Sequence, residues 1–194
     1  MLLGPISIII GYLLGSIPTA YIMGKSRKGI DIREVDTRNM GAGSTFRQVG
    51  LWEGAVVALV DIGKGAAAIL VAQAVGVSQP FVLAAGFAAI LGHSFPFSIG
   101  FRGGQGVATI MGIFLVLAPE VMLVILGLMG VALLLTRHIF TMTCITAPFL
   151  PLLIWLFDKS AMFLFYSLVI IAFVVFRNRH RLKEFRLVAN KNKR

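Results

Sequence analysis

Long apolar stretches alternate with short polar ones along almost the whole chain. They predict seven membrane-spanning helices, at residues 1–24, 52–77, 81–92, 106–118, 121–136, 142–157 and 161–176. A full crossing takes about 20 apolar residues, so the third and fourth segments are short. Because these two flank a Gly- and Pro-rich stretch, we expect broken helices there, with irregular backbone buried at membrane depth. The pattern predicts one all-α integral membrane domain with some helices short or broken.

Composition supports this class. Hydrophobic residues make up 58% of the chain and charged residues 13%, whereas soluble domains have about 45–50% and about 25%. The one cysteine, Cys144, excludes an intramolecular disulfide. The three histidines lie on separate segments without the spacing of metal ligands, so we expect neither a metal nor a cofactor.

The net charge of +10 is concentrated on one side of the predicted membrane. If residues 25–50 face the cytoplasm, every Lys and Arg except Lys159 lies on that side. Because positive residues in short loops favour the cytoplasmic face, we expect the N-terminus outside and the C-terminus, with a basic tail at 177–194, in the cytoplasm. Cations so placed suit anionic membrane lipids and give no reason to expect nucleic acid.

The first loop, residues 25–50, combines small, amide, hydroxyl and cationic side chains. Asn39 and Ser44 can hydrogen-bond hydroxyl groups or phosphate oxygens, and Arg47 can hold a phosphate through two parallel hydrogen bonds. Gly41 permits close approach of the backbone. This inventory fits a phosphorylated polyol; the alternative is an ordinary solvated loop.

Asp61 and Lys64 lie inside an apolar run, AVVALVDIGKGAAAILVA. Their spacing of three places them on one helical face, where they can pair. Ionisable groups at membrane depth are costly and are usually functional. We therefore expect a role in the site, with a structural ion pair that clamps the first loop as the alternative.

A second polar stretch, LGHSFPFSIGFRGGQGVAT at residues 91–109, is dense in glycine. Such a turn can point successive N–H groups at an anion, with Arg102 nearby and a helix beginning near Gly106. The alternative is a helix break in which the glycines allow close packing. A histidine at a helix end, such as His93, is more often a cap or packing residue than a catalyst.

Four segments resemble those of one known family. GSIPTAYIMGK at 15–25 is similar to its opening span, and RNMGAGSTFRQVG at 38–50 stands in the place of its GSGNxGATNxxRxxG signature. VDIGKG at 60–65 matches its D-x-x-KG, and GHSFPFSIGFRGGQGVAT at 92–109 resembles its GHxFPxFxxFKGGKGVAT. The chain is identified as a divergent member of the bacterial acyl-phosphate:glycerol-3-phosphate acyltransferase family.

The resemblance implies a seven-helix enzyme of the bacterial inner membrane whose site faces the cytoplasm. Such enzymes transfer an acyl group from acyl phosphate to the 1-hydroxyl of glycerol 3-phosphate, which gives lysophosphatidate and phosphate without a cofactor. The implied partners are these two substrates and membrane lipids, with the acyl-phosphate-forming enzyme as a candidate. The residues implied are Thr37, Asn39, Gly41, Ser44, Arg47, Asp61 and Lys64 for glycerol phosphate; His93, Arg102, Gly103, Gly104, Gln105 and Gly106 for acyl phosphate; and Thr143, Cys144, Asn178 and His180 for catalysis.

This chain departs from the family pattern within the implied site. Gln105 replaces a lysine of the glycine loop, and the serine of an S-L-x-S pattern aligns with Cys144, or with Thr143 if the gap is moved by one. Asn178 replaces the histidine of R-H-R-E-N, and His180 can compensate only if the helix register or rotamer differs. Further departures are Thr37 and Arg38 for a serine and a glycine, Ser44 for an asparagine, and Arg181 for an asparagine.

These departures leave a second interpretation open. Loss of one phosphate-binding cation costs about 1.5–3 kcal/mol, unless Arg102, Arg38 or Arg181 restores the charge. The alternative to an active acyltransferase is a diverged, non-catalytic lipid- or phosphate-binding membrane protein, or a transporter, on the same scaffold.

Overall fold

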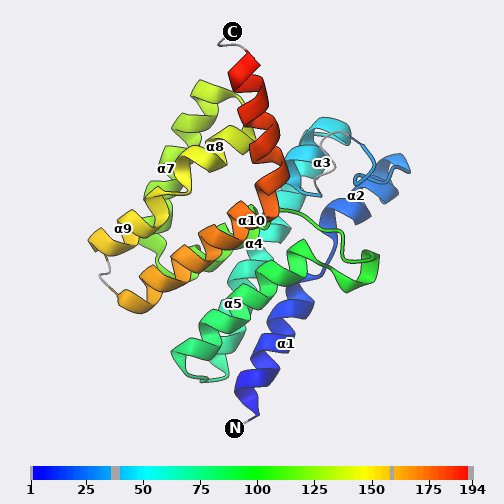
Figure 1. Ribbon diagram of the computed structural model, residues 1–194. Helices are drawn as coiled ribbons and strands as arrows, with labels where there is room; N and C mark the ends of the chain where they lie inside the picture. The colour runs from blue at the N-terminus through cyan, green and yellow to red at the C-terminus, as the bar shows by residue number, and fades with distance from the viewer. Residues whose placement is uncertain (1, 36–39, 158–159, 192–194) are drawn as a thin grey trace.

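The described part of the chain is organised as a set of helices (Figure 1). The computed structural model describes residues 2–35, 40–157 and 160–191, with side chains as far as Arg179. The helices are α1 (Leu3–Gly15), α2 (Thr19–Lys28), α3 (Ala42–Gln48), α4 (Leu51–Ala74), α5 (Gln79–Ser94), the 3₁₀ turn η1 (Phe97–Ile99), α6 (Val107–Leu117), α7 (Pro119–Thr136), α8 (Ile139–Thr146), α9 (Phe149–Phe157) and α10 (Ala161–Lys191).

Six helical segments in the described residues are long and apolar enough to cross a membrane. They are Leu3–Lys28, Leu51–Ala74, Gln79–Ile99, Pro119–Thr136, Ile139–Phe157 and Ala161–Arg179. The apolar helix α6 has only 11 residues, so the fourth predicted segment is short as expected. The predicted all-helical membrane class is confirmed, whereas seven crossings and the orientation stay predictions.

Three of these segments are interrupted beside a proline. Pro18 lies between α1 and α2, Pro96 lies between α5 and η1, and Pro148 lies between α8 and α9. Proline lacks a backbone N–H, and its ring clashes with the preceding turn, so it breaks a helix interior. The first break matters for the site because it exposes carbonyl groups in the middle of a membrane segment.

Two helical segments extend beyond the predicted spans. The third segment, predicted as 81–92, runs from Gln79 to Ile99 when η1 is included, and Pro80 opens it because proline suits the first helical turn. The last helix does not end at residue 176: α10 continues to Lys191, through most of the predicted tail. Residues 177–191 include Arg, Leu, Lys and Glu and lack Gly and Pro, so they favour a helix.

Glycine allows two pairs of helices to pack with their backbones in close approach. A Cβ on Gly15 of α1 would overlap the backbone of Ala89 on α5. A Cβ on Gly112 of α6 would overlap the backbone of Ile62 on α4. Small residues at such interfaces are typical of helices that associate in lipid.

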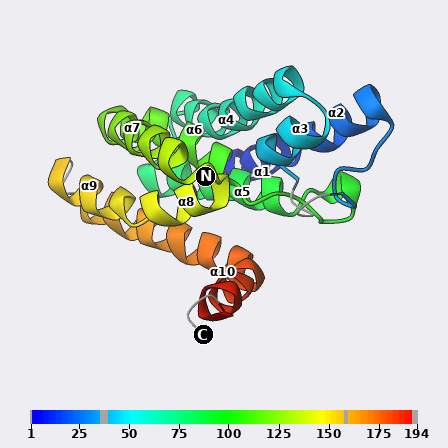
Figure 2. The same cartoon turned by 90° about the horizontal axis from the view of Figure 1, so that it is seen from above.

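The segments predicted to be cytoplasmic lie away from the amino end of α1. The amino end of α1 and the carboxyl end of α10 lie at opposite ends of the molecule, and the α4–α5 turn lies with the former (Figure 1). Seen from above, α2 and α3 lie on one side and α7 and α9 on the other (Figure 2). The loop that follows α5 lies on the side of α2 and α3 in both views (Figure 1 and Figure 2).

Candidate active site

Lys64 and Asp61 form a buried ion pair on α4. The Lys64 Nζ lies 2.6 Å from the Asp61 Oδ1, and the two side chains are 4% and 3% exposed. Their spacing places them on one helical face, as predicted. Because neither group reaches water, removing one of them would leave an uncompensated charge inside the protein.

Lys64 also bridges the break between α1 and α2. Its ammonium donates to the carbonyl of Ile17 at 2.7 Å and to that of Gly15 at 3.5 Å. Carbonyls at a helix end lack an intrahelical partner, so they need a donor from elsewhere. A carboxylate and two carbonyls thus surround the ammonium, which favours a structural role over direct contact with substrate, although the segment that the pair clamps is the α1–α2 break and not the first loop.

His93 connects this ion pair to the glycine-rich stretch. Its Nδ1 lies 3.7 Å from the Asp61 Oδ1, and the residue is 6% exposed. Gly104 lies against the other edge of the ring, since a Cβ on Gly104 would overlap both the His93 Nε2 and the carbonyl of Met40. The imidazole therefore fills the space between α4 and residues 100–106, which we call the glycine loop. Met40 brings the first loop to the same point.

Gly103 and Gly104 close the glycine loop onto the end of α5. The N–H of Gly103 donates to the carbonyl of Ser94, and the N–H of Gly104 donates to the carbonyl of His93, both at 3.1 Å. The predicted nest is wrong for these two N–H groups, because they already have partners. Glycine is required here for close approach: a Cβ on Gly103 would overlap the carbonyl of His93.

The start of α6 offers a better place for an anion. Gly106 takes a left-handed conformation with φ of 79°, and no side chain caps the helix that begins at Val107. The N–H groups of Val107, Ala108 and Thr109 therefore lack intrahelical partners, and they carry the positive end of the helix dipole. The hydroxyls of Ser94 and Thr109 are buried nearby and have no hydrogen-bond partner within the described chain.

Arg177 fastens α10 to the glycine loop. Its Nη2 donates to the carbonyl of Gly103 at 3.1 Å, and its guanidinium carbon lies 5.2 Å from the centre of the Phe95 ring. The sequence places Arg177 only in the basic tail and in the R-H-R-E-N motif. The structure adds a cation beside the loop in which Gln105 replaces the family's lysine.

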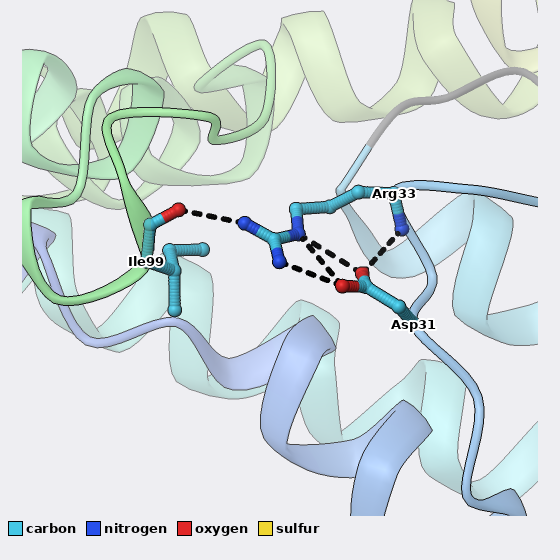
Figure 3. Close-up of polar contacts among 3 residues, drawn as sticks. All are labelled: Asp31, Arg33 and Ile99. Carbon is cyan, nitrogen blue, oxygen red and sulfur yellow. Dashed lines mark hydrogen bonds and ion pairs between the residues drawn. The ribbon is translucent and has the colours of Figure 1, made fainter.

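Arg33 joins the first loop to η1, a link that the sequence does not reveal (Figure 3). Its Nε and Nη2 donate to the carboxylate of Asp31 at 2.9 and 2.6 Å, and its Nη1 donates to the carbonyl of Ile99 at 2.6 Å. The hydrogen bond from Arg33 lowers the pKa of the Asp31 carboxyl below its usual value. The same hydrogen bond raises the pKa of Arg33. This D-x-R pair holds the first loop against the turn that precedes the glycine loop.

The remaining first-loop candidates lie on or beside the short helix α3. Gly41 precedes it, Ser44 is buried in it and Arg47 is exposed on it. Thr37 and Asn39 lie outside the described residues. A Cβ on Gly43 would overlap the side chain of Ile139, which shows that α3 meets the start of α8.

Two predicted catalytic residues bond within their own helices. The Thr143 hydroxyl donates to the carbonyl of Ile139, and the Asn178 amide donates to that of Val174, each at 2.9 Å. Back-bonding of this kind is common for hydroxyls in membrane helices. Each side chain keeps an oxygen with which it can still accept a hydrogen bond.

The structure does not bury every predicted residue among the polar groups of the site. Cys144 and Arg102 are both exposed. No contact described for the chain joins the Cys144 thiol to the polar groups above. The side chain of His180 lies outside the described part, so its catalytic role stays a prediction.

An apolar cavity adjoins the site. Its walls come from α6, α7, α8, α9 and α10 and include Val107, Ile110, Phe114, Met122, Thr143 and Val174. Val107 follows the glycine loop directly, and Val174 accepts the hydrogen bond from Asn178. The cavity thus begins where the polar groups end.

Known proteins resemble this chain over nearly its full length. The family model described as glycerol-3-phosphate acyltransferase matches residues 5–189. A glycerol-3-phosphate acyltransferase of Thermosynechococcus vestitus is 39% identical, over 90% of this chain and 88% of its own. One of Geobacter sulfurreducens is 34% identical, over 91% of each chain.

The crystal structure of PlsY, an integral membrane glycerol 3-phosphate acyltransferase in its glycerol 3-phosphate form, has a similar fold. It superposes with a TM-score of 0.88 at 30% identity, over 96% of this chain and 92% of that one. The lysophosphatidic acid form of PlsY gives a TM-score of 0.85 at 29% identity. The fold, the motifs and these comparisons agree: the chain belongs to the glycerol-3-phosphate acyltransferase family.

Proposed function

We propose that this protein transfers an acyl group from acyl phosphate to the 1-hydroxyl of glycerol 3-phosphate. The glycerol oxygen bonds to the acyl carbon, and the bond from that carbon to the phosphate oxygen breaks with its electron pair leaving on phosphate. The hydroxyl proton also ends on phosphate, so the products are lysophosphatidate and inorganic phosphate. Relatives of this chain are named for acylation of glycerol 3-phosphate.

One observation carries the proposal: the two polar loops meet at the mouth of an apolar cavity. Gly104 lies between His93 and the carbonyl of Met40, and Arg177 holds the same loop from α10. A polar acceptor and a lipid donor can therefore react at the boundary between the loops and the cavity.

The chain's contribution would be positioning and charge stabilisation. Acyl phosphate is already activated, so its own oxygens can accept the hydroxyl proton. The open N–H groups at the start of α6, with the cation of Arg177 nearby, would stabilise the phosphate as its negative charge grows. Holding the acceptor hydroxyl against the acyl carbon would supply the rest of the rate.

Glycerol 3-phosphate would bind on the first-loop side. Arg47 is a cation of α3, and Ser44 lies on the same helix. An arginine fork binds a phosphate through two parallel hydrogen bonds, which gives orientation as well as affinity. Arg47→Gln should raise KM for glycerol 3-phosphate while Arg27→Gln, a change at an exposed arginine paired with Glu53, should not.

The acyl chain of the donor would lie in the apolar cavity. The cavity starts at Val107, next to the α6 N–H groups proposed for phosphate. This arrangement places the reacting carbonyl at the cavity mouth, between the phosphate and the acceptor.

The proposed setting is the inner membrane of a bacterium, with seven crossings, the N-terminus outside and the site facing the cytoplasm. The asymmetry of Lys and Arg supports this orientation. The acyl-phosphate-forming enzyme is the proposed partner that supplies the donor. A reporter that is active only in the cytoplasm should be active when it is fused after Arg194. A reporter that is active only in the periplasm should be inactive at the same position.

The deciding experiment measures phosphate released from palmitoyl phosphate by purified protein, with and without glycerol 3-phosphate. Release that depends on glycerol 3-phosphate, with lysophosphatidate formed, is the expected result. Release that is independent of it would indicate hydrolysis or another acceptor. No release from folded protein would favour the non-catalytic binding protein.

A further inference from the structure

Arg33 is hydrogen-bonded to two parts of the chain that lie on either side of the proposed reaction. Figure 3 shows its guanidinium between Asp31, two residues earlier in the first loop, and Ile99, the last residue of η1. Nε and Nη2 donate to the Asp31 carboxylate, and Nη1 donates to the Ile99 carbonyl at 2.6 Å. This last hydrogen bond joins residues that are 66 positions apart in the chain.

The first loop and α2 hold the guanidinium in place. The Asp31 Oδ1 also accepts the backbone N–H of Arg33 at 3.0 Å, so two groups of one residue fix the carboxylate. The central carbon of the guanidinium lies 4.8 Å from the centre of the Tyr21 ring on α2. Because a guanidinium is planar and carries its N–H groups in a fixed fork, these contacts leave Nη1 directed at Ile99.

The carbonyl that Arg33 holds lies where the glycine loop begins. Gly100 and Phe101 follow Ile99 with φ of 72° and 58°, and such an angle is uncommon for a residue as bulky as phenylalanine. The Phe101 side chain is exposed, so its packing does little to hold this conformation. Two hydrogen bonds support the turn: the Phe101 N–H donates to the Pro96 carbonyl at 3.0 Å, and Arg33 donates to the carbonyl just before the turn. Arg33 therefore helps to set the direction in which the glycine loop leaves η1.

We propose that Arg33 is a positioning residue for acyl transfer, which fixes the first loop and the acceptor bound there relative to the glycine loop. The inference rests on the proposed function, because that function assigns the acceptor to the first loop and the donor phosphate to the start of α6, where the glycine loop ends. Arg33 is not among the residues proposed to hold either substrate. Further along both loops, the Met40 carbonyl lies against Gly104. The two loops are thus joined at two points, and Arg33 supplies the first of them.

Loss of Arg33 should lower kcat more than it affects binding. Each substrate keeps the residues proposed to hold it, but the acceptor hydroxyl and the acyl carbon are no longer held at reacting distance. A displacement of about 1 Å at the reacting atoms can cost about a hundredfold in rate. We expect kcat of Arg33→Ala to fall about tenfold or more, and KM for glycerol 3-phosphate to change less than about threefold.

Two tests separate the geometry of Arg33 from its charge. Arg33→Lys keeps the charge, but its single nitrogen cannot replace Nε, Nη1 and Nη2 at once, so its kcat should fall as well. Guanidinium ion at millimolar concentration should restore part of the kcat of Arg33→Ala, where it can take the place of the lost group, and not that of Arg33→Lys. Arg27→Ala is the matched control: Arg27 is an exposed arginine of α2, paired with Glu53 at 3.8 Å, and its loss should leave kcat unchanged.

The experiment measures lysophosphatidate formed from palmitoyl phosphate and glycerol 3-phosphate by each purified variant, well below its unfolding temperature. A purely structural role would leave kcat unchanged there, since all of the protein is folded. Wild-type kcat in folded Arg33→Ala would overturn the proposal. An unchanged kcat with a raised KM would also overturn it, because Arg33 would then bind the acceptor. If Arg33→Ala fails to fold, Arg33→Lys decides, and a wild-type kcat in that variant would overturn the proposal.

The wild type tests the proposed function separately. A folded wild-type protein that forms no lysophosphatidate would refute the proposed function itself. An active wild type whose folded Arg33 variants keep its kcat would refute only the positioning role of Arg33.

Discussion

Replacing Lys64 with methionine is the most informative single change in the polar centre. Methionine has nearly the length of lysine but no charge and no donor. The substitution removes the ion pair with Asp61 and the hydrogen bonds to the carbonyls of Gly15 and Ile17. It also leaves the Asp61 carboxylate, 3% exposed, without its partner.

The expected cost is large because the pair is buried. Breaking a buried ion pair by removing one member costs about 3–5 kcal/mol, most of it from the charge left behind. For a chain of this size that lowers the unfolding temperature by on the order of 10 °C. The double variant Asp61→Asn/Lys64→Met buries no unpaired charge, so it should recover much of this loss.

The assay is thermal unfolding in detergent for the wild type, both single variants and the double variant. KM for glycerol 3-phosphate should be measured in parallel, below the unfolding temperature of each. Under the clamp hypothesis the single variants lose stability and the double variant is partly restored. A Lys64→Met protein that unfolds at the wild-type temperature but has KM raised tenfold or more would refute this reasoning, because Lys64 would then bind substrate.

Three further predictions concern the loops. Gln105→Lys should lower KM for acyl phosphate about tenfold, because it adds a charge-assisted hydrogen bond to phosphate; an unchanged KM would mean that the charge is already supplied. Arg177→Ala should raise that KM by releasing the glycine loop, whereas Arg179→Ala, at an exposed arginine that lies over Phe176, should not. The hydrogen bond from Arg33 lowers the folded pKa of the Asp31 carboxyl below its usual value, so the resulting stabilisation is present above that usual value and is lost as pH falls through the folded value. Asp31→Asn should therefore weaken the fall in unfolding temperature on acidification below about pH 4, and an unchanged acid dependence would contradict this.

The membrane class and the short fourth helix could be predicted because they follow from local apolar runs. The Asp61–Lys64 pair could also be predicted, since three-residue spacing fixes a shared helical face. The hydrogen-bond partners of Lys64 could not be predicted. The carbonyls of Gly15 and Ile17 are backbone groups about 50 residues earlier in the chain, and only the packing of α1 against α4 brings them within reach.

The glycine loop shows a different limit of prediction from the sequence. Its glycines suit both a phosphate nest and a close packing contact, and the choice depends on where the N–H groups point. The structure directs those of Gly103 and Gly104 to the end of α5, which leaves the start of α6 for an anion. The contact of Arg177 with the glycine loop could not be predicted for a related reason. An apolar span followed by a basic run is also typical of an ordinary membrane anchor.

The contacts of Gly104 connect the two halves of the proposed reaction. Its backbone lies against His93, whose other edge faces Asp61, and against the carbonyl of Met40 in the first loop. A shift of the first loop on binding glycerol 3-phosphate would therefore press on the loop proposed to hold the donor, and through His93 on the buried ion pair. Protein interiors are close-packed, so such a shift is transmitted rather than absorbed. The geometry thus favours a site in which acceptor and donor are positioned together by a shared wall.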